Sequence, residues 1–143
     1  MYRVTLILLM FSMNSYGFCF DEAGKKFDIN PLLLKAIAYT ESRLDPNAIN
    51  DSNTNGTTDY GLMQINSSWF ARLADFGVSE NSVINEPCTN VYVGAWILAQ
   101  NMAQTGDGWL AVGAYNAGYR ESRKKARDRY IDLVQINLME LQK

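Results

Sequence analysis

The chain has 143 residues, a formal net charge of −2, two cysteines and no histidine. This length suits a single folded domain, and the lack of histidine excludes Ser-His and Cys-His nucleophile systems and His-ligated metal sites. Two cysteines cannot complete a four-cysteine zinc site, and the slightly acidic charge gives no support to nucleic-acid binding. We therefore expect no metal and no cofactor, and any chemistry must use carboxylates, hydroxyls and amides.

Residues 1–17 have the pattern of a secretory signal peptide. A short basic start precedes an apolar run from Val4 to Met13, and small residues follow it. The run is too short for a permanent membrane anchor; the alternative is an N-terminal core helix. Cleavage after Gly17 would leave a mature domain of residues 18–143, exported to the periplasm without an anchor.

The two cysteines, Cys19 and Cys88, form an even pair, which in an exported chain is typical of one disulfide. Such a bond would close a loop of about 70 residues, which the chain-entropy description values at roughly 4 kcal/mol. It would fasten the N-terminal end to the middle of the chain. The alternative is two unpaired, buried thiols.

Asn30 and Pro31 predict the start of a helix, because Asn can cap free backbone amides and Pro suits the first helical position. Pro disfavours helical geometry in the residue before it, so Asp45-Pro46 predicts the end. Positions separated by three and four residues share one face of this helix. On the inner face these are Leu34, Ile37, Ala38 and Glu41.

Glu41 occupies a position on this face where another apolar residue is expected. A carboxyl group seldom points into a core unless it is paired or used. Burial and the negative end of the helix dipole would both raise the pKa of Glu41, which favours the protonated form that a general acid requires. The alternative is an ion pair with Arg43 or with a basic residue of the last helix.

The rest of the chain predicts one small β-hairpin and further short helices, which makes the fold mainly α (α+β). The hairpin is expected over residues 47–60, with Asn55-Gly56 in a type I′ turn. Residues 77–87 are interpreted as a linker. Further helices are expected over residues 67–77, 87–105, 109–116 and 121–141. The inward positions of the last helix are expected to be Ala126, Tyr130, Leu133, Val134 and Leu138.

Asp59 lies at the end of a predicted hairpin strand, where it can face the end of the Glu41 helix. Glycosidic bond cleavage commonly uses one carboxyl group as a proton donor and a second that stabilises positive charge, attacks it or activates water. The alternative is an ordinary turn residue, since Asp, Asn, Thr and Gly all favour turns.

Aromatic and amide side chains near these motifs could bind a sugar polymer. Trp69 and Trp96 are instead assigned to packing. The basic residues between Arg120 and Arg129 are interpreted as a solvated helix face, with attraction of an anionic polymer as the alternative. The candidates for stacking on sugar faces include Tyr60, Tyr115, Tyr119 and Tyr130, and the candidates for amide contacts are Gln64 and Asn116.

Three ordered motifs resemble those of the soluble-lytic-transglycosylase-like family, and they are Glu41-Ser42, Gly61-Leu62-Met63-Gln64 and Ala114-Tyr115-Asn116-Ala117-Gly118. The segment Tyr130-Ile131-Asp132-Leu133-Val134 looks like the fourth motif of that family. The similarity covers residues 18–135. The small size, the signal peptide and the two cysteines further resemble invasion-associated transglycosylases that accompany specialised secretion systems.

This resemblance implies a lysozyme-like fold and cleavage of the β-1,4 bond between N-acetylmuramic acid and N-acetylglucosamine in peptidoglycan, with a 1,6-anhydro product. Glu41 would protonate the leaving oxygen and then, as a base, assist the muramic C6 hydroxyl. Ser42 would orient the substrate or Glu41. The residues expected to bind substrate are Ser42, Tyr60, Gly61, Met63, Gln64, Tyr115, Asn116 and Tyr130.

The stretch of residues 53–69 looks closer to the hairpin of C-type lysozymes, in which the aspartate before Tyr-Gly is the second catalytic carboxylate. By this resemblance Asp59 joins Glu41 as a catalytic candidate. We expect a monomer that opens the wall locally for a secretion system and contacts its inner rod or another periplasmic component. The alternatives are a muramidase that hydrolyses the same bond and a non-catalytic peptidoglycan-binding subunit.

Overall fold

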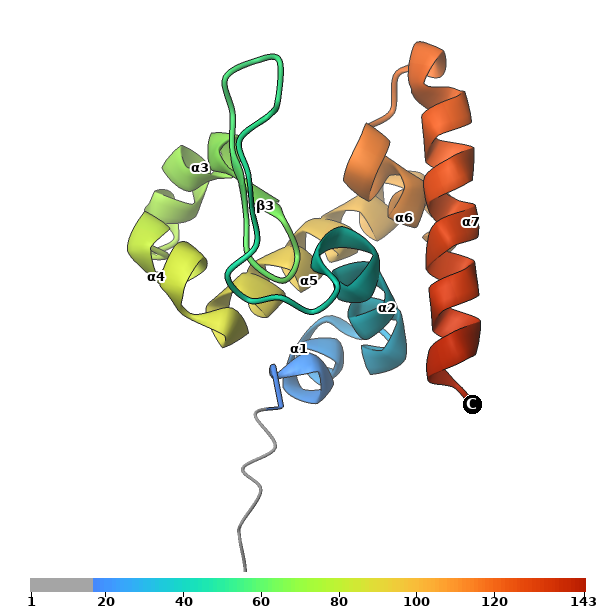
Figure 1. Cartoon of the computed structure of the whole chain (residues 1–143), viewed down its shortest axis with the longest axis horizontal. Helices are drawn as coiled ribbons and strands as arrows, with labels where there is room; N and C mark the ends of the chain where they lie inside the picture. Colours follow the sequence, from blue (N-terminus) through green and yellow to red (C-terminus); the bar gives the residue numbers. More distant parts are fainter. Residues whose placement is uncertain (1–16) are drawn as a thin grey trace, which may run out of the picture.

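Helices make up most of the computed structural model, which describes residues 17–143, and a small sheet stands beside them (Figure 1). All but the last residue of the predicted signal peptide lies outside the described residues. The helices are α1 (Phe20–Phe27), α2 (Pro31–Ser42), α3 (Phe70–Asp75), α4 (Glu80–Asn85), α5 (Pro87–Thr105), α6 (Gly108–Ala117) and α7 (Lys124–Leu141). The 3₁₀ helices η1 (Ser67–Trp69) and η2 (Glu121–Arg123) precede α3 and α7.

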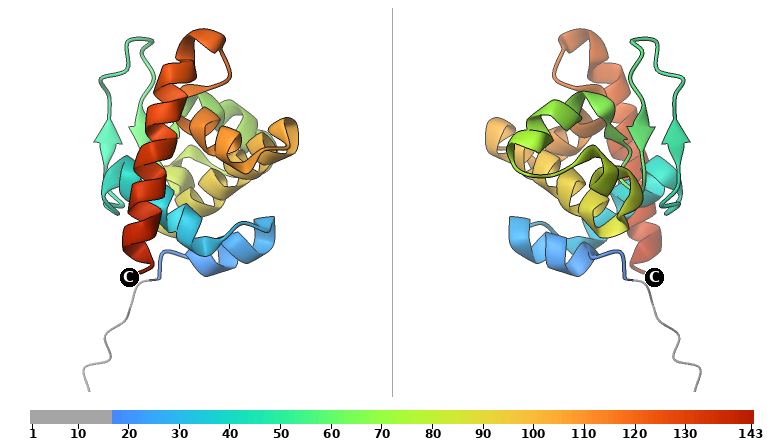
Figure 2. Two further views of the ribbon diagram at one scale, coloured as in Figure 1. Left: turned by 90° about the vertical axis from the view of Figure 1, so that its right-hand side faces the viewer. Right: turned by 90° about the vertical axis from the view of Figure 1, so that its left-hand side faces the viewer.

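The predicted mainly α fold with one small sheet is confirmed, and it agrees with a lysozyme-like arrangement. Helix α7 packs along α2 and α6, and α5 packs against α1, α4 and α6. The tip of the hairpin and the connection from α6 to α7 lie at the same end of the molecule, away from α1 (Figures 1 and 2). Within residues 17–143, no helix combines the length and the apolar character needed to cross a membrane.

Helix α2 begins as the sequence predicts and ends earlier. The Asn30 side chain accepts a hydrogen bond of 2.9 Å from the backbone N–H of Leu32, and Pro31 is the first helical residue. The helix ends at Ser42, before Asp45-Pro46, because Arg43 (φ 55°) and Leu44 (φ 63°) both adopt the left-handed conformation. The N–H of Arg43 closes this end on the carbonyl of Tyr39 at 3.0 Å.

The sheet has three antiparallel strands in the order β1 (Ile49–Asn50), β2 (Asp59–Tyr60) and β3 (Ile65–Asn66). The first two confirm the predicted hairpin, and β3 is an additional strand. One row across the sheet joins Ile49, Tyr60 and Ile65, and the next joins Asn50, Asp59 and Asn66. Because neighbouring residues of a strand point to opposite faces, one face of the sheet is largely apolar and the other is polar.

The hairpin turn differs from the predicted type I′ turn. The N–H of Gly56 donates to the carbonyl of Asn53 at 3.2 Å, so the central residues are Thr54 and Asn55. A type I′ turn needs positive φ at both of its central residues, whereas in residues 53–57 only Gly56 (φ 77°) has it. The glycine therefore follows the turn instead of forming its centre.

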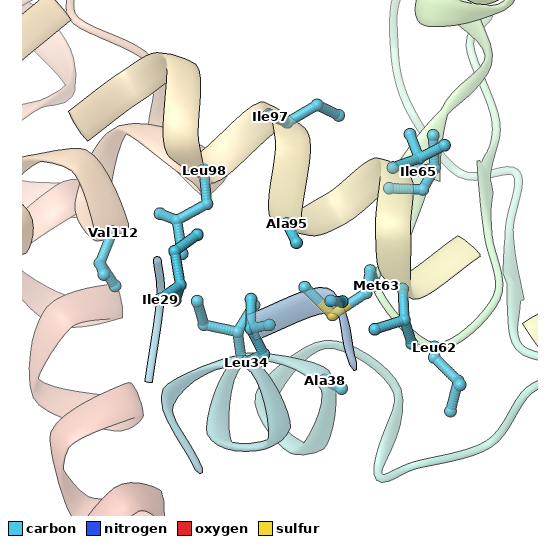
Figure 3. Packing of buried hydrophobic residues seen from close by; sticks show 14 of the residues in the cluster. Ile29, Leu34, Ala38, Leu62, Met63, Ile65, Ala95, Ile97, Leu98 and Val112 are labelled. Atoms are coloured by element: carbon cyan, nitrogen blue, oxygen red, sulfur yellow. The ribbon is translucent and has the colours of Figure 1, made fainter. Parts of the chain in front are cut away.

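The core lies between α2, α5 and the segment after β2 (Figure 3). Three of the predicted inner positions of α2 are fully buried, and Figure 3 shows two of them, Leu34 and Ala38, facing Ala95 and Leu98 of α5. Met63 enters from the other side and fills the space left by Gly94, where an added Cβ would lie 2.7 Å from its Cε atom. The predicted face of α2 is thus confirmed.

The structure contains two helices that were not predicted, and the prediction that Leu133 of α7 faces inward is wrong. Helix α1 was not predicted, and α4 falls in the segment interpreted as a linker, where the Ser79 hydroxyl caps it by accepting from the N–H of Ser82 at 3.1 Å. Leu133 is 53% exposed, whereas Arg127 is buried. The Arg127 guanidinium donates hydrogen bonds to two backbone carbonyls in the connection from α6 to α7. Burial of Arg127 therefore provides partners for these carbonyls and also removes its apolar methylene groups from water.

Cys19 and Cys88 form a disulfide, with their Cα atoms 5.3 Å apart. The bond joins the residue before α1 to the first turn of α5. The predicted disulfide is present, and the alternative of two free thiols is wrong.

Candidate active site

Glu41 lies in the last turn of α2 and is mostly removed from water. Burial raises its pKa from the ordinary value of 4.5 to about 7, and the negative charge of Asp59 adds to the rise. The hydroxyl of Tyr130, from α7, donates a hydrogen bond of 2.5 Å to Oε1 of Glu41 and opposes the rise. The carboxyl group therefore exchanges its proton near neutral pH, which suits a group that must both donate and accept one.

Glu41 forms no ion pair within residues 17–143, so the alternative of an ion pair with Arg43 or a basic residue of the last helix is wrong. Its partner from the last helix is the phenol of Tyr130, not a basic residue. The Arg43 guanidinium stacks on the ring of Tyr39 at 4.9 Å. In residues 17–143 the salt bridges are Lys124 with Asp128 and Lys143 with Glu140.

Asp59 receives three hydrogen bonds from asparagine side chains. The Nδ2 atom of Asn66 lies 2.7 Å from Oδ1, and those of Asn53 and Asn50 lie 2.9 Å and 3.2 Å from Oδ2. Asn50 and Asn66 are the direct cross-strand neighbours of Asp59 in the sheet. Asp59 is thus built into the polar face of the sheet, and the description of it as a turn residue does not match this position.

Glu41 and Asp59 line one open cleft with a volume of about 720 Å³. Its walls come from the hairpin, the end of α2, helices α5 and α6, and the 3₁₀ helices η1 and η2. The remaining lining residues are Asn50, Asn53, Thr54, Asn55, Thr57, Gln64, Ile65, Asn66, Trp69, Ile97, Tyr115, Asn116 and Arg123. Most of these side chains carry hydroxyl or amide groups, which can exchange hydrogen bonds with sugar hydroxyls.

Of the residues expected to bind substrate, Gln64, Tyr115 and Asn116 line the cleft. The Tyr115 hydroxyl donates to the carbonyl of Met63 at 2.7 Å, and burial, followed by the charges of Glu41 and Asp59, raises the pKa of Tyr115 well above its ordinary value. Tyr115 therefore stays neutral and fixes the α6 wall against the segment that contains Gln64.

Ser42, Tyr60, Gly61 and Met63, which were also expected to bind substrate, are not among the residues that line the cleft. The Ser42 hydroxyl bonds to the carbonyls of Ala38 and Leu62, at 3.0 Å and 2.9 Å, which fastens the end of α2 to the segment after β2. The side chain of Met63 is fully buried in the core. The Tyr60 ring stacks on Phe70 at 5.8 Å between centroids. The structure places these three side chains, and Gly61, outside the cleft lining.

Asn90 is a buried residue that the sequence reasoning missed. Its Nδ2 atom donates to the carbonyls of Tyr60 and Val83, and its Oδ1 atom accepts from the N–H of Met63 at 2.8 Å. A Cβ atom on Gly61 (φ 76°) would lie 2.5 Å from that Nδ2 atom. The signal in the sequence was an amide in the first turn of the largely apolar helix α5.

Three further groups of cleft residues were missed or assigned elsewhere. Trp69 was assigned to packing; it does contact Trp96 edge-to-face at 5.7 Å, and it also lines the cleft. Arg123 was included in a solvated basic face, although it is the cation in the cleft lining. The asparagines around Asp59 escaped notice because their proximity depends on the strand register. In residues 17–143 no group of three or more His, Cys, Asp or Glu residues could hold a metal ion.

Comparison with known proteins identifies the domain type. Residues 18–135 match the family described as "Transglycosylase SLT domain". The chain is 44% identical to protein IpgF of Shigella flexneri over 92% of this chain and 87% of that protein. It is 42% identical to invasion protein IagB of Salmonella typhimurium strain LT2 over 98% of this chain and 88% of that protein. It is also 44% identical to X polypeptide of Escherichia coli, over 78% and 65% of the two chains.

Proposed function

Since this chain belongs to the transglycosylase SLT domain family, we propose that it cleaves the bond between N-acetylmuramic acid and N-acetylglucosamine with formation of a 1,6-anhydro ring. The chain is a lytic transglycosylase, an enzyme that acts on peptidoglycan. The observation that supports the finer proposal is the pKa of Glu41, about 7. At neutral pH this side chain is therefore present in both its protonated and its ionised form.

The proposed reaction uses Glu41 twice and consumes no water. The protonated carboxyl group first donates its proton to the glycosidic oxygen, so that the N-acetylglucosamine unit leaves with a free hydroxyl. The resulting carboxylate then accepts the proton of the muramic C6 hydroxyl as that oxygen bonds to C1. A single group can do both because its pKa lies near the working pH.

Asp59 is proposed as the second catalytic group. Its carboxylate lies in the same cleft and would stabilise the positive charge that develops on the sugar ring as the bond breaks. This arrangement also supports a second candidate function, in which Glu41 and Asp59 hydrolyse the same bond as a muramidase. The two functions differ in their products, because an anhydro-muropeptide is one water lighter than a hydrolysed one.

Digestion of purified peptidoglycan followed by mass analysis tests both proposals. We expect anhydro-muropeptides from the wild-type chain and none above background from Glu41→Gln, while circular dichroism shows that the variant is folded. We expect Asp59→Asn to lower the rate substantially. Hydrated products would favour the muramidase. Binding to sacculi without released products would indicate a non-catalytic subunit, and full activity of Glu41→Gln would remove Glu41 from the mechanism.

The setting of the reaction is also a proposal. The pattern of residues 1–17 supports export and cleavage after Gly17, followed by action in the periplasm as a monomer. One relative, IagB, is named an invasion protein, which supports local opening of the wall for a secretion system, with an inner-rod or other periplasmic component as partner. N-terminal sequencing of the periplasmic protein tests the first step, and we expect it to begin at Phe18.

A further inference from the structure

We propose that Arg123 binds a carboxylate carried by the muramic acid units of the substrate, so that the cleft selects peptidoglycan over neutral sugar polymers. This inference rests on the proposed cleavage of peptidoglycan strands in the cleft. It assigns a function to a residue that belongs to none of the sequence motifs and that the sequence reasoning placed on a solvated helix face.

Arg123 is one of six basic residues around the start of α7, and the six have different surroundings. Lys124 forms a salt bridge with Asp128 at 2.7 Å. Arg127 is buried, whereas the others are exposed, and Arg123 is the one that lines the cleft. The remaining exposed members are Arg120, Lys125 and Arg129. Position, and not charge alone, therefore distinguishes Arg123 from its neighbours.

The backbone that carries Arg123 is held in place by Arg127. The guanidinium of Arg127 donates to the carbonyls of Gly118 and Arg120, at 3.1 Å and 2.7 Å, in the connection from α6 to α7. The N–H of Arg123 donates to the carbonyl of Arg120 at 2.9 Å, which closes the turn of η2. The connection thus has a fixed course, and the exposed Arg123 side chain extends from a defined backbone position.

The carboxyl groups of the cleft have other partners, so the charge of Arg123 is available to a ligand. Glu41 is hydrogen-bonded to Tyr130, and Asp59 to three asparagines. Arg123 takes part in neither of the salt bridges found in residues 17–143. The remaining cleft-lining residues are uncharged. Amides and hydroxyls are sufficient to bind neutral sugars, so a cation in this lining indicates an anionic group on the ligand.

Arg123 lies where a substituent of a bound glycan strand would leave the cleft. The connection from α6 to α7 and the hairpin tip lie at the same end of the molecule, and α2, which carries Glu41, lies further from that end (Figures 1 and 2). Thr54 and Asn55 of the hairpin tip line the same cleft as Arg123. The cleft therefore extends from Glu41 to this end, where Arg123 can contact a group that projects from the strand.

Peptidoglycan carries such a group on its muramic acid units. The C3 lactyl ether of the sugar ends in a carboxyl group, which in the cell wall is amide-linked to a stem peptide whose own carboxyl groups are free. The guanidinium of arginine presents a planar fork of donors that matches a carboxylate at two points. A stem peptide and an unsubstituted lactyl group both offer a carboxylate, whereas a polymer of N-acetylglucosamine alone offers none.

The test compares Arg123→Ala and Arg123→Lys with the wild type on three soluble substrates. The first is glycan strands with their stem peptides, and the second is strands from which an amidase has removed the stems, which leaves the lactyl carboxylate free. The third is strands whose carboxyl groups have all been capped as methylamides. Arg129→Ala is the matched control, because it removes the same charge from an exposed position outside the cleft lining.

For Arg123→Ala on stem-bearing strands we expect a KM about tenfold higher and an unchanged kcat, because the contact is present in the ground state and the transition state alike. Arg123→Lys should recover part of this loss, since it keeps the charge without the two-point contact. Arg129→Ala should have the KM of the wild type. On capped strands the wild type and Arg123→Ala should have the same KM.

The amidase-treated strands identify the source of the carboxylate. If the loss for Arg123→Ala disappears on these strands, the stem peptide supplies the carboxylate, and if the loss persists, the lactyl group can supply it as well. Equal KM values for the wild type and Arg123→Ala on both the stem-bearing and the amidase-treated strands overturn the inference. A loss of the same size on capped strands, or for Arg129→Ala, also overturns it.

A binding measurement separates this inference from the proposed reaction. The affinity of labelled stem-bearing strands is compared for Glu41→Gln and for the double variant Glu41→Gln, Arg123→Ala, in which no turnover is expected. About tenfold weaker binding by the double variant supports the function of Arg123 even if the wild type releases no anhydro product, and equal binding overturns it even if the wild type does. Thermal unfolding confirms that each variant is folded, and Arg123→Lys provides the test if Arg123→Ala is not.

Discussion

Glu41→Gln is expected to stabilise the protein at alkaline pH while it abolishes activity. The folded state holds the pKa of Glu41 at about 7 against an ordinary value of 4.5, so the proton is bound more tightly in the folded than in the unfolded chain. Between these two values stability falls as pH rises, because the unfolded chain has already lost its proton. At about 1.36 kcal/mol per pKa unit, the ionised carboxylate destabilises the folded state by roughly 3 kcal/mol above pH 7.

Glutamine has the shape of the protonated acid, can accept the hydrogen bond from Tyr130, and does not ionise. Urea unfolding of wild type and Glu41→Gln from pH 4 to pH 9 measures the difference. We expect near-equal stability at pH 4 and an advantage for the variant that grows to roughly 3 kcal/mol by pH 8. All other titrating groups cancel in this difference. A pH-independent difference, or a variant that becomes relatively less stable as pH rises, would refute the burial argument.

Three further predictions concern the supports of the site. Tyr130→Phe removes the hydrogen bond that lowers the pKa of Glu41, so the alkaline limb of the rate profile, which lies near pH 7 in the wild type, should move to higher pH; a shift to lower pH would contradict this. Gly61→Ala should reduce stability by about 1–3 kcal/mol, because its φ is positive and its Cβ would press on the amide of Asn90; denaturant unfolding measures the loss, and Gly106→Ala, also at positive φ but in open space, should lose less. Reducing the disulfide should lower stability by roughly 4 kcal/mol, as measured by unfolding with and without reductant, and an unchanged midpoint would show that the bond does not constrain the unfolded chain.

Local signals in the sequence were sufficient to place Glu41. The cap and proline at Asn30-Pro31 fixed the start of α2, and the spacing of Leu34, Ile37 and Ala38 then determined which way Glu41 points. The same spacing could not find the end of the helix, which depends on left-handed residues that carry side chains. The same spacing also misplaced the buried face of α7. Arg127 lies on that face although its side chain is charged, whereas Leu133 lies outside it.

The parts of the site that could not be predicted depend on partners far along the chain. Asn66 contacts Asp59 only because β3 pairs with β2, and a strand of two residues has no periodicity to detect. Asn90 was missed because its three hydrogen-bond partners all lie outside α5, far from the pattern of that helix. Met63 belongs to a motif and yet its side chain is core, since Gly94 provides the space for it.

The two left-handed residues that end α2 have opposite consequences for stability and for activity. Arg43 and Leu44 follow Glu41 almost directly, and a side chain in this conformation raises the free energy of the folded state by roughly 1 kcal/mol or more. Glycine at position 43 would remove that strain. It would also free the bend that aims the last turn of the helix. Selection for thermal resistance alone would therefore favour glycine there, whereas selection for catalysis would favour a residue that keeps the bend stiff.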